Sequence, residues 1–164
     1  MRYNLSALQL SQCLLVAERR NCAKLANGIT NNKIDDKQDD FGINLAGVMS
    51  EYVVAKYLGT CLDYSLSAGG DGGVVDLKVN DATIQVKSTT RGSADLYVRK
   101  RESIKADFYV SCSFPAPNAV EIAGYASREM FLERGAVRKL ITPVWFLCET
   151  ELRPIKELKN KLKN

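Results

Sequence analysis

The N-terminal part of the chain carries two stretches in which apolar residues recur every three or four positions. In the first, from Leu5 to about Ala26, the recurring apolar residues predict one packing face, and Gly28 follows as a helix stop signal. That face consists of Leu5, Leu8, Leu15, Cys22 and Leu25. In the second, from about Phe41 to Leu58, the pattern ends before Gly59, as is typical of a helix C-terminus. We expect two helices, the first packing through its leucine face.

The strand-rich remainder of the chain follows two polar or glycine-rich segments. Thr30 to Asp40 is rich in Asn and Asp and predicts a mobile loop, and Ser65 to Gly73 predicts a flexible, turn-rich connection. Two strands are expected at Ala106 to Phe114 and at Ala119 to Ala126, with prolines in the connection between them. We expect these two strands to lie in the β-sheet formed by the C-terminal part of the chain.

The C-terminal part adds helices to these strands. Ser127 is a predicted N-cap of a short helix that ends at Gly135, the run VWFLCE predicts a last strand, and Pro154 precedes a basic amphipathic helix. This order predicts an α/β fold in which a mixed central β-sheet of at least four strands is flanked by helices. The 164 residues fit a single domain. Its expected parts are an N-terminal helix and polar loop (1–40), a core (41–158) and a basic tail (159–164).

A predicted hairpin precedes the two long strands, in the segment GGVVDLKVNDATIQVKS. If Asn80 and Asp81 form a two-residue turn, antiparallel pairing places Leu77 opposite Ile84. The same register places Asp76 opposite Gln85. Directly opposed side chains are neighbours on one face of a sheet, so this acid and this amide are expected to lie together.

One face of this hairpin is expected to carry chemistry and the other to join the core. Lys87 shares the face of Gln85 because side chains alternate along a strand. The Asp76 carboxylate, the Gln85 amide oxygen and the Val86 carbonyl are hard ligands that suit Mg²⁺, with Mn²⁺ as a substitute. A solvated strand also shows Asp, Gln and Lys on its outer face, so both interpretations of the hairpin stay open.

Glu51 is a second unusual acid, in the middle of the second predicted helix. Its helical neighbours are small or apolar, which places its carboxylate at the edge of the buried face; they are Gly47, Val48, Val54 and Ala55. Burial of a carboxylate there costs several kcal/mol unless a cation or hydrogen-bond donors compensate. We therefore expect Glu51 to have a partner.

Composition narrows the chemistry further. The chain contains no histidine, which excludes Ser-His-Asp, Cys-His, HNH-type and His-ligated zinc sites. Its five cysteines form no CxxC pair and are expected to be reduced, small core residues. The formal net charge of +4 suits a polyanionic partner without demanding one. The N-terminus lacks a signal peptide and no window is apolar enough for a membrane span, so we expect a soluble cytoplasmic protein without a membrane partner.

From about Phe41 to Leu158 the chain resembles the PD-(D/E)XK nuclease superfamily. In that superfamily a helix carrying Glu precedes a strand carrying Asp and then a strand with (D/E)-x-K. The matching segments here are GVMSEYVVAKYLG, GGDGGVVDLKV and TIQVKS, and ADFYV is similar to the strand that follows the active site. The resemblance implies a restriction-endonuclease-like core at 41–158 and a nuclease-like domain over 1–164.

Four candidate catalytic residues follow from that resemblance by position. Glu51 resembles the helical acid that supports metal or water, Asp76 the central metal ligand, and Lys87 the lysine that orients the attacking water. Gln85 departs from the pattern, because an amide stands where an acid is usual; the loss of charge weakens Mg²⁺ binding without removing the oxygen ligand. Asp71 is a secondary acid, although an Asp before two glycines is more often a turn former.

Nucleic-acid contacts are expected beside the hairpin. Hydroxyls follow Lys87 at Ser88, Thr89 and Thr90, where they suit phosphate contact or an ordinary strand end. Basic residues that suit phosphates are Arg91, Arg99, Lys100 and Arg101. The basic tail, with Arg153, Lys156, Lys159, Lys161 and Lys163, is at least as well explained as solubilising surface.

These residues predict a Mg²⁺-dependent endonuclease that hydrolyses phosphodiester bonds of DNA. Two alternatives stay open: a structure-selective nuclease like a Holliday junction resolvase, and a catalytically inactive nucleic-acid-binding protein of the same fold. RNA also stays open as the substrate. A homodimer is compatible with cutting both strands of a duplex, but no segment declares an interface.

Overall fold

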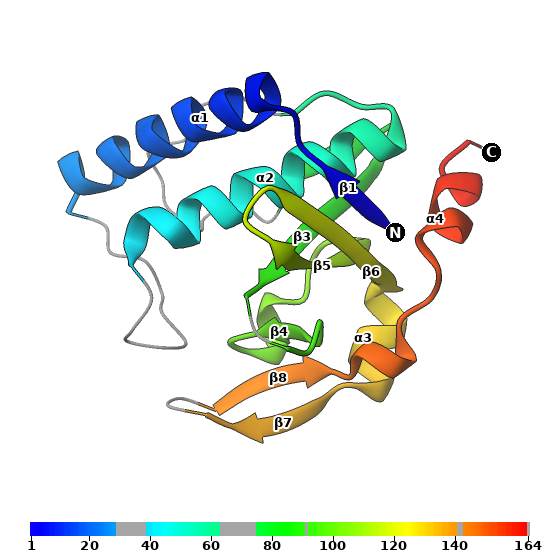
Figure 1. Cartoon of the computed structure of the whole chain (residues 1–164). Helices are drawn as coiled ribbons and strands as arrows, with labels where there is room; N and C mark the ends of the chain where they lie inside the picture. The colour runs from blue at the N-terminus through cyan, green and yellow to red at the C-terminus, as the bar shows by residue number, and fades with distance from the viewer. Residues whose placement is uncertain (29–38, 63–74, 91, 141–142, 164) are drawn as a thin grey trace.

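The computed structural model describes residues 1–28, 39–62, 75–90, 92–140 and 143–163 (Figure 1). Most of the predicted loop at Thr30 to Asp40 and all of Ser65 to Gly73 lie outside the described residues. The candidate residues Asp71 and Arg91 lie outside them as well. The rest of the candidate site falls within the described part of the chain.

Both predicted N-terminal helices are confirmed. Helix α1 (Ala7–Ala26) begins at Ser6, whose side chain accepts a hydrogen bond from the Gln9 N–H, while the Gln9 side chain accepts one from the Ser6 N–H. Helix α2 (Asp40–Leu58) begins after Asp39, whose side chain accepts from the Gly42 N–H at 2.6 Å. It ends at Gly59, which has a φ of 81° that glycine adopts at little cost.

The predicted packing face of the first helix is confirmed for Leu5, which is buried in the core, and is wrong for its other four residues. Leu8, Leu15 and Leu25 are 70%, 50% and 68% exposed, and Cys22 is exposed too. The helix instead buries Cys13, Val16 and Ala17. Polar side chains continue this face toward the helix C-terminus, where Asn21 and Lys24 contact Asn44 of α2. A pattern based on the large apolar residues therefore selected the opposite side of the helix.

A five-stranded mixed sheet, the main sheet, forms the centre of the molecule, with strand order β1-β6-β5-β3-β2. Its strands are β1 (Arg2–Asn4), β2 (Leu77–Val79), β3 (Ala82–Thr89), β5 (Phe108–Ala116) and β6 (Ala119–Ser127). Strands β3 and β5 are parallel and the other neighbours are antiparallel. The hairpin and the two long strands were predicted; the three-residue β1 at the edge was not.

A second, three-stranded sheet was not predicted. Its order is β4-β8-β7, with β4 (Leu96–Val98), β7 (Ala136–Lys139) and β8 (Pro143–Leu147). Within the described ranges the other elements are α3 (Arg128–Arg134), α4 (Ile155–Lys161) and the 3₁₀ turns η2 (Arg101–Ser103) and η3 (Glu149–Glu151). The predicted caps of α3 are confirmed, because the Ser127 side chain accepts from the Met130 N–H and the helix ends at Gly135.

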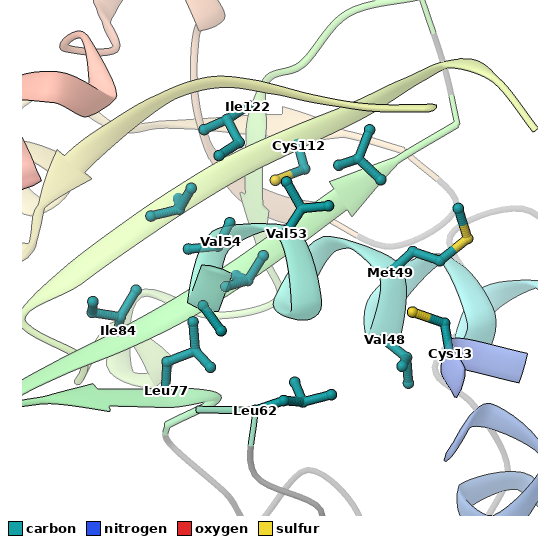
Figure 2. Close-up of a cluster of buried hydrophobic side chains, with 14 of the residues drawn as sticks. Cys13, Val48, Met49, Val53, Val54, Leu62, Leu77, Ile84, Cys112 and Ile122 are labelled. Carbon is teal, nitrogen blue, oxygen red and sulfur yellow. The ribbon is translucent and has the colours of Figure 1, made fainter. Parts of the chain in front are cut away.

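The main sheet is covered on both faces, each by its own apolar core. On one face, α2 packs Val48, Met49, Val53 and Val54 against residues of the sheet that include Ile84 and Ile122 (Figure 2). On the other, Tyr109 and Ala126 of the sheet pack against α3 and the second sheet. The expected mixed sheet flanked by helices is confirmed, and the second sheet is an additional layer.

The five cysteines are free thiols with different environments. Cys13 and Cys112 are buried as predicted, and burial raises their pKa to about 11 and about 12. The prediction of a core position is wrong for Cys22 and Cys61, which are exposed.

None of the helices in the described ranges has both the length and the apolar character required to cross a membrane. The longest, α1 and α2, have 20 and 19 residues, and both carry charged side chains.

Gly124 in β6 is expected to be intolerant of any side chain. A Cβ there would lie 2.7 Å from the Arg153 carbonyl oxygen and 2.8 Å from the Leu152 Cβ. The backbone cannot move away easily, because Tyr125 and Arg153 exchange two backbone hydrogen bonds of 2.9 and 2.8 Å. Gly124→Ala is therefore expected to lower the free energy of unfolding by about 1–3 kcal/mol, measured by urea denaturation.

Gly92→Ala is the matched control for this substitution. A Cβ added at Gly92 would have no heavy atom within 4 Å. We therefore expect the free energy of unfolding of Gly92→Ala to stay within about 0.5 kcal/mol of that of wild type. Equal denaturation midpoints for the two variants would contradict the close approach at Gly124.

Candidate functional site

The predicted hairpin register is confirmed next to the turn. Leu77 pairs with Ile84, and Val79 pairs with Ala82. Asn80 has a φ of 53°, in the left-handed region that Asn tolerates better than most residues. The regular ladder starts at Leu77, so the predicted pair of Asp76 and Gln85 is not part of it.

Asp76 instead makes two hydrogen bonds to the neighbouring strand. Its N–H donates to the Ile84 carbonyl at 3.0 Å. Its carboxylate Oδ2 accepts from the Val86 N–H at 2.6 Å, a short bond of the kind that an ionised acceptor makes. The carboxylate is therefore held at the peptide that links Gln85 to Val86.

Gln85 and Lys87 lie on the face of the main sheet that is turned away from α2. Ile84 and Val86 belong to the core beneath α2, and alternation places Gln85 and Lys87 on the opposite face, where both are partly buried. Their paired residues on β5 are Tyr109 and Ser111. The structure thus brings Asp76 to the strand segment that carries the predicted amide and lysine.

Tyr109 links this face to the second core. Its buried hydroxyl accepts from the N–H groups of Lys105 at 2.8 Å and Ala106 at 3.1 Å. Burial raises the pKa of Tyr109, and the negative charge of Asp76 adds to that increase.

Glu51 has the cationic partner that its burial required. The Arg20 Nη1 of α1 lies 2.8 Å from Glu51 Oε2 and 3.0 Å from Oε1, and the two side chains are 25% and 11% exposed. Glu51 is on α2, on the side of the sheet opposite to Gln85 and Lys87. The structure therefore does not bring Glu51 together with Gln85 and Lys87, and the role that it shows for Glu51 is in the α1–α2 contact.

More polar contacts extend the interface between α1 and α2, and none of them was predicted from the sequence. Lys24 Nζ donates to Asn44 Oδ1 at 2.9 Å, and Asn44 Nδ2 donates to Asn21 Oδ1 at 3.0 Å. The available signal was helical spacing, because Asn21 and Lys24 follow Ala17 at intervals of four and seven and share its face. Polar residues at those intervals look solvated unless a partner helix is known.

A second polar cluster, also missed, surrounds the buried Asp95. Its carboxylate accepts from the Tyr97 hydroxyl at 3.0 Å, Arg138 Nη1 at 3.0 Å and the Glu149 N–H at 2.9 Å. Burial alone would raise the pKa of Asp95, but these donors and the Arg138 charge outweigh it and hold the pKa below its usual range. The neighbouring Ala94 carbonyl accepts from the Ser111 hydroxyl, so the cluster joins the second sheet to the face of Lys87.

The predicted phosphate-binding residues are accessible where the structure describes them. Ser88, Arg99, Lys100 and Arg101 are exposed, and Thr89 is partly buried at the end of β3. The guanidinium carbon of Arg101 lies 5.8 Å from the centre of the Trp145 ring, a cation–π distance, which limits its mobility.

The oxygen atoms that could bind a metal at the hairpin suit only a hard metal ion. Within the described ranges, no group of three or more Asp, Glu, Cys or His side chains is arranged to hold a metal. At the peptide between Gln85 and Val86 the hairpin offers the Asp76 carboxylate together with the neutral oxygens of Gln85 and the Val86 carbonyl. Oxygen ligands of low total charge fit Mg²⁺ that keeps several waters, and they fit zinc poorly.

The chain was compared with models of protein families, with curated proteins and with solved structures. None of the three comparisons found a match.

Proposed function

We propose that the protein is a metal-dependent endonuclease that hydrolyses phosphodiester bonds of DNA. The main support is the hydrogen bond from the Val86 N–H to the Asp76 carboxylate, which holds an acid at the strand segment carrying Gln85 and Lys87. The acid and the amide supply oxygen ligands that a hard metal ion accepts, and the ammonium group can position a water, so this chemistry does not require histidine.

The residues of the hairpin each have a role in this proposal. The Asp76 carboxylate, the Gln85 amide oxygen and the Val86 carbonyl would hold Mg²⁺ or Mn²⁺. The ion supplies a Lewis acid and a bound water of lowered pKa when it is present. Lys87 positions the attacking water and balances the charge that develops on the phosphate. Glu51 has no contact role at the ion in this proposal, because it lies on the α2 side of the sheet and is held by Arg20.

Binding of the DNA backbone falls to the accessible residues near the hairpin. Ser88 and Thr89 follow Lys87 on β3, and Arg99, Lys100 and Arg101 lie between β4 and β5. Hydroxyl, guanidinium and ammonium groups contact phosphates without reading sequence, so affinity is expected to fall steeply as salt rises.

A second candidate function is a nucleic-acid-binding protein without catalysis. It is favoured by the close pairing of Glu51 with Arg20, since a carboxylate held by a guanidinium is a weak support for a metal or a water. The amide at Gln85 also favours this second function, because an acid at that position would have given the site a second negative charge beside Asp76. Metal binding separates the two functions.

Lys87→Ala is the decisive variant for catalysis. With plasmid DNA and Mg²⁺ or Mn²⁺, we expect it to cleave about 100-fold more slowly than wild type, because the water loses its positioning group. Lys78→Ala is the control, because Lys78 is exposed on β2 of the same hairpin. This variant has the same net charge as Lys87→Ala and is expected to cleave DNA as fast as wild type does. Equal loss in both variants would indicate weaker DNA binding instead of catalysis.

Calorimetric titration with Mn²⁺ then tests the metal site. Wild type is expected to bind the ion and Asp76→Asn to bind it at least tenfold more weakly, because the carboxylate charge is lost. Unchanged Mn²⁺ binding by Asp76→Asn, or no DNA cleavage by wild type with either ion, would overturn the proposed nuclease activity. DNA binding that persists and weakens with salt would then support the second function.

A further inference from the structure

The positive charge of the chain is concentrated in one short segment that includes α4. Residues 153–163 contain five basic side chains and one acid, Glu157, which gives the segment a formal charge of +4. This value equals the formal net charge of the whole chain, so the remaining residues sum to zero. The basic residues are Arg153, Lys156, Lys159, Lys161 and Lys163. A charge gathered in this way attracts an anionic partner.

Three of these lysines share one side of the helix. Lys156, Lys159 and Lys163 are separated by three and four residues, the spacing of neighbours on a helix surface. Lys156 and Lys163 are exposed and Lys159 is partly buried. These three lysines are named the α4 basic face. Glu157 and Lys161 are four residues apart and share a different side, so the acid of this segment does not belong to the face.

The charge of the α4 basic face is not neutralised within the described ranges. Ion pairs there join the N-terminal amine, Arg20, Arg128 and Arg138 to acids, and none involves a lysine of the face. The helix dipole explains a cation in the last turn of α4, but it disfavours a cation in the first turn, where Lys156 lies. Local stabilisation of the helix therefore does not account for the whole face.

The α4 basic face has a fixed position beside the hairpin. At the hairpin turn, Asn80 Nδ2 donates to the Leu162 carbonyl at 2.8 Å. The Lys159 Nζ lies 4.6 Å from the centre of the Tyr57 ring of α2, a cation–π distance. These contacts hold α4 against both α2 and the hairpin, so the lysines stand on an ordered base.

We propose that the α4 basic face binds the sugar–phosphate backbone of nucleic acid, as a second contact outside the polar face of the hairpin. The choice of partner rests on the proposed function, since both of its candidates take nucleic acid. Lysines about 5–6 Å apart on one side of a helix can each reach a phosphate of a strand that carries one charge per about 3.4 Å. The ammonium groups act as point charges, so the contact is independent of base sequence.

The exposed residues of α4 favour nucleic acid over an anionic membrane. They are Lys156, Glu157, Asn160 and Lys161, and none of them is apolar. A helix that lies on a membrane inserts exposed apolar side chains between the lipids. The apolar residues Ile155 and Leu158 of α4 are buried inside the protein instead.

Fluorescence anisotropy with a labelled DNA duplex in metal-free buffer tests this contact separately from cleavage. The double variant Lys156→Gln with Lys163→Gln is expected to bind the duplex about tenfold more weakly than wild type near physiological salt. The slope of the logarithm of affinity against the logarithm of salt concentration is expected to become shallower by about 2, because each lost phosphate contact removes about 0.9.

Arg19→Gln with Arg134→Gln is the matched control for the loss of two charges. Both arginines are exposed, on α1 and α3, and this variant is expected to bind DNA within about threefold of wild type. Lys156→Arg with Lys163→Arg keeps the charge and is expected to bind DNA as wild type does. All three variants are expected to keep the melting temperature of wild type, because the replaced side chains are exposed. Equal loss of affinity in the two glutamine variants, or a wild type that does not bind DNA, would overturn the inference.

Vesicles of phosphatidylserine and phosphatidylcholine test the lipid alternative. Wild type and Lys156→Gln with Lys163→Gln are expected to show equally little co-sedimentation with these vesicles. Vesicle binding that this variant loses, together with an unchanged affinity for DNA, would overturn the inference in favour of a membrane surface.

Single-turnover cleavage with saturating protein separates this inference from the proposed catalysis. The variant Lys156→Gln with Lys163→Gln is expected to cleave bound DNA within about twofold of the wild-type rate, because α4 contributes no group to the hairpin chemistry. A loss of the bound-state rate as large as that in Lys87→Ala would overturn the assignment of the α4 basic face to binding. A wild type that binds DNA through this face but does not cleave it would contradict the nuclease and leave the contact standing.

Discussion

Replacing Asp95 with alanine is expected to lower the free energy of unfolding by about 4 kcal/mol at neutral pH. The substitution leaves the Tyr97 hydroxyl, the Arg138 guanidinium and the Glu149 N–H without their common acceptor. Arg138 can turn toward solvent because its side chain is 41% exposed, but the Glu149 N–H is fixed in the backbone. The cluster links β4 to β7 and to the turn after β8, so the second sheet is expected to loosen.

Urea denaturation measures this loss, with Glu133→Ala as the control. Glu133 is an exposed acid on α3, and its removal is expected to change the free energy of unfolding by no more than about 0.5 kcal/mol. If Asp95→Ala lowers the free energy of unfolding by less than about 1 kcal/mol, the three donors do not need the Asp95 carboxylate as their acceptor.

The contribution of Asp95 to the free energy of unfolding is expected to decrease as the pH falls. Because its pKa is lower in the folded protein than in the unfolded chain, its contribution is present above the unfolded pKa and is lost as the pH falls through the folded pKa. The difference in unfolding free energy between wild type and Asp95→Ala should therefore be constant near neutrality and shrink below about pH 4. A difference that grows on acidification would contradict the direction of the shift.

Replacing Arg20 with alanine is expected to lower the free energy of unfolding by about 3 kcal/mol. Glu51 is the more deeply buried member of the pair, and removal of the guanidinium leaves its carboxylate in an environment of low polarity. Arg134→Ala, at an exposed arginine of α3, is the control and is expected to change stability by at most about 0.5 kcal/mol.

A double-mutant cycle separates this ion pair from other effects of Arg20. In a Glu51→Gln background the cost of Arg20→Ala should fall, with a coupling energy of about 0.5–3 kcal/mol. The same variants are informative for cleavage: if Glu51 serves mainly the α1–α2 contact, Glu51→Gln keeps activity under conditions in which it stays folded. An additive cycle would show that the two side chains do not depend on each other.

Much of the fold could be predicted because its signals are local. The Ser127 cap, the glycines after α2 and α3 and the Asn-Asp turn each act within a few residues, and all were confirmed where expected. The short strands β1, β4 and β7 have three, three and four residues. Segments this short carry too few positions for an alternating pattern, and they become strands only when a neighbouring strand pairs with them.

The candidate site could be predicted in part. The hairpin register and the shared face of Gln85 and Lys87 follow from alternation along one strand, which is a local property. The hydrogen bond from Val86 to Asp76 could not be predicted, because it depends on how the chain enters β2 just before the ladder begins. The partner of Glu51 could not be predicted either, since Arg20 is 31 residues away in the sequence.

The sequence alone determined the positions of the four helices, the hairpin and the chemical groups on its polar face, because backbone geometry and capping act over one or two turns. Only the tertiary structure decided which side of α1 is buried, which cation meets Glu51 and where Asp95 finds its donors. These contacts join residues that are far apart in the chain. The sequence makes several sides of a helix or strand nearly equally apolar or polar, and tertiary packing decides which side is used. In α1 the buried residues are Cys13, Val16 and Ala17, whereas Leu8, Leu15 and Leu25 lie at the surface.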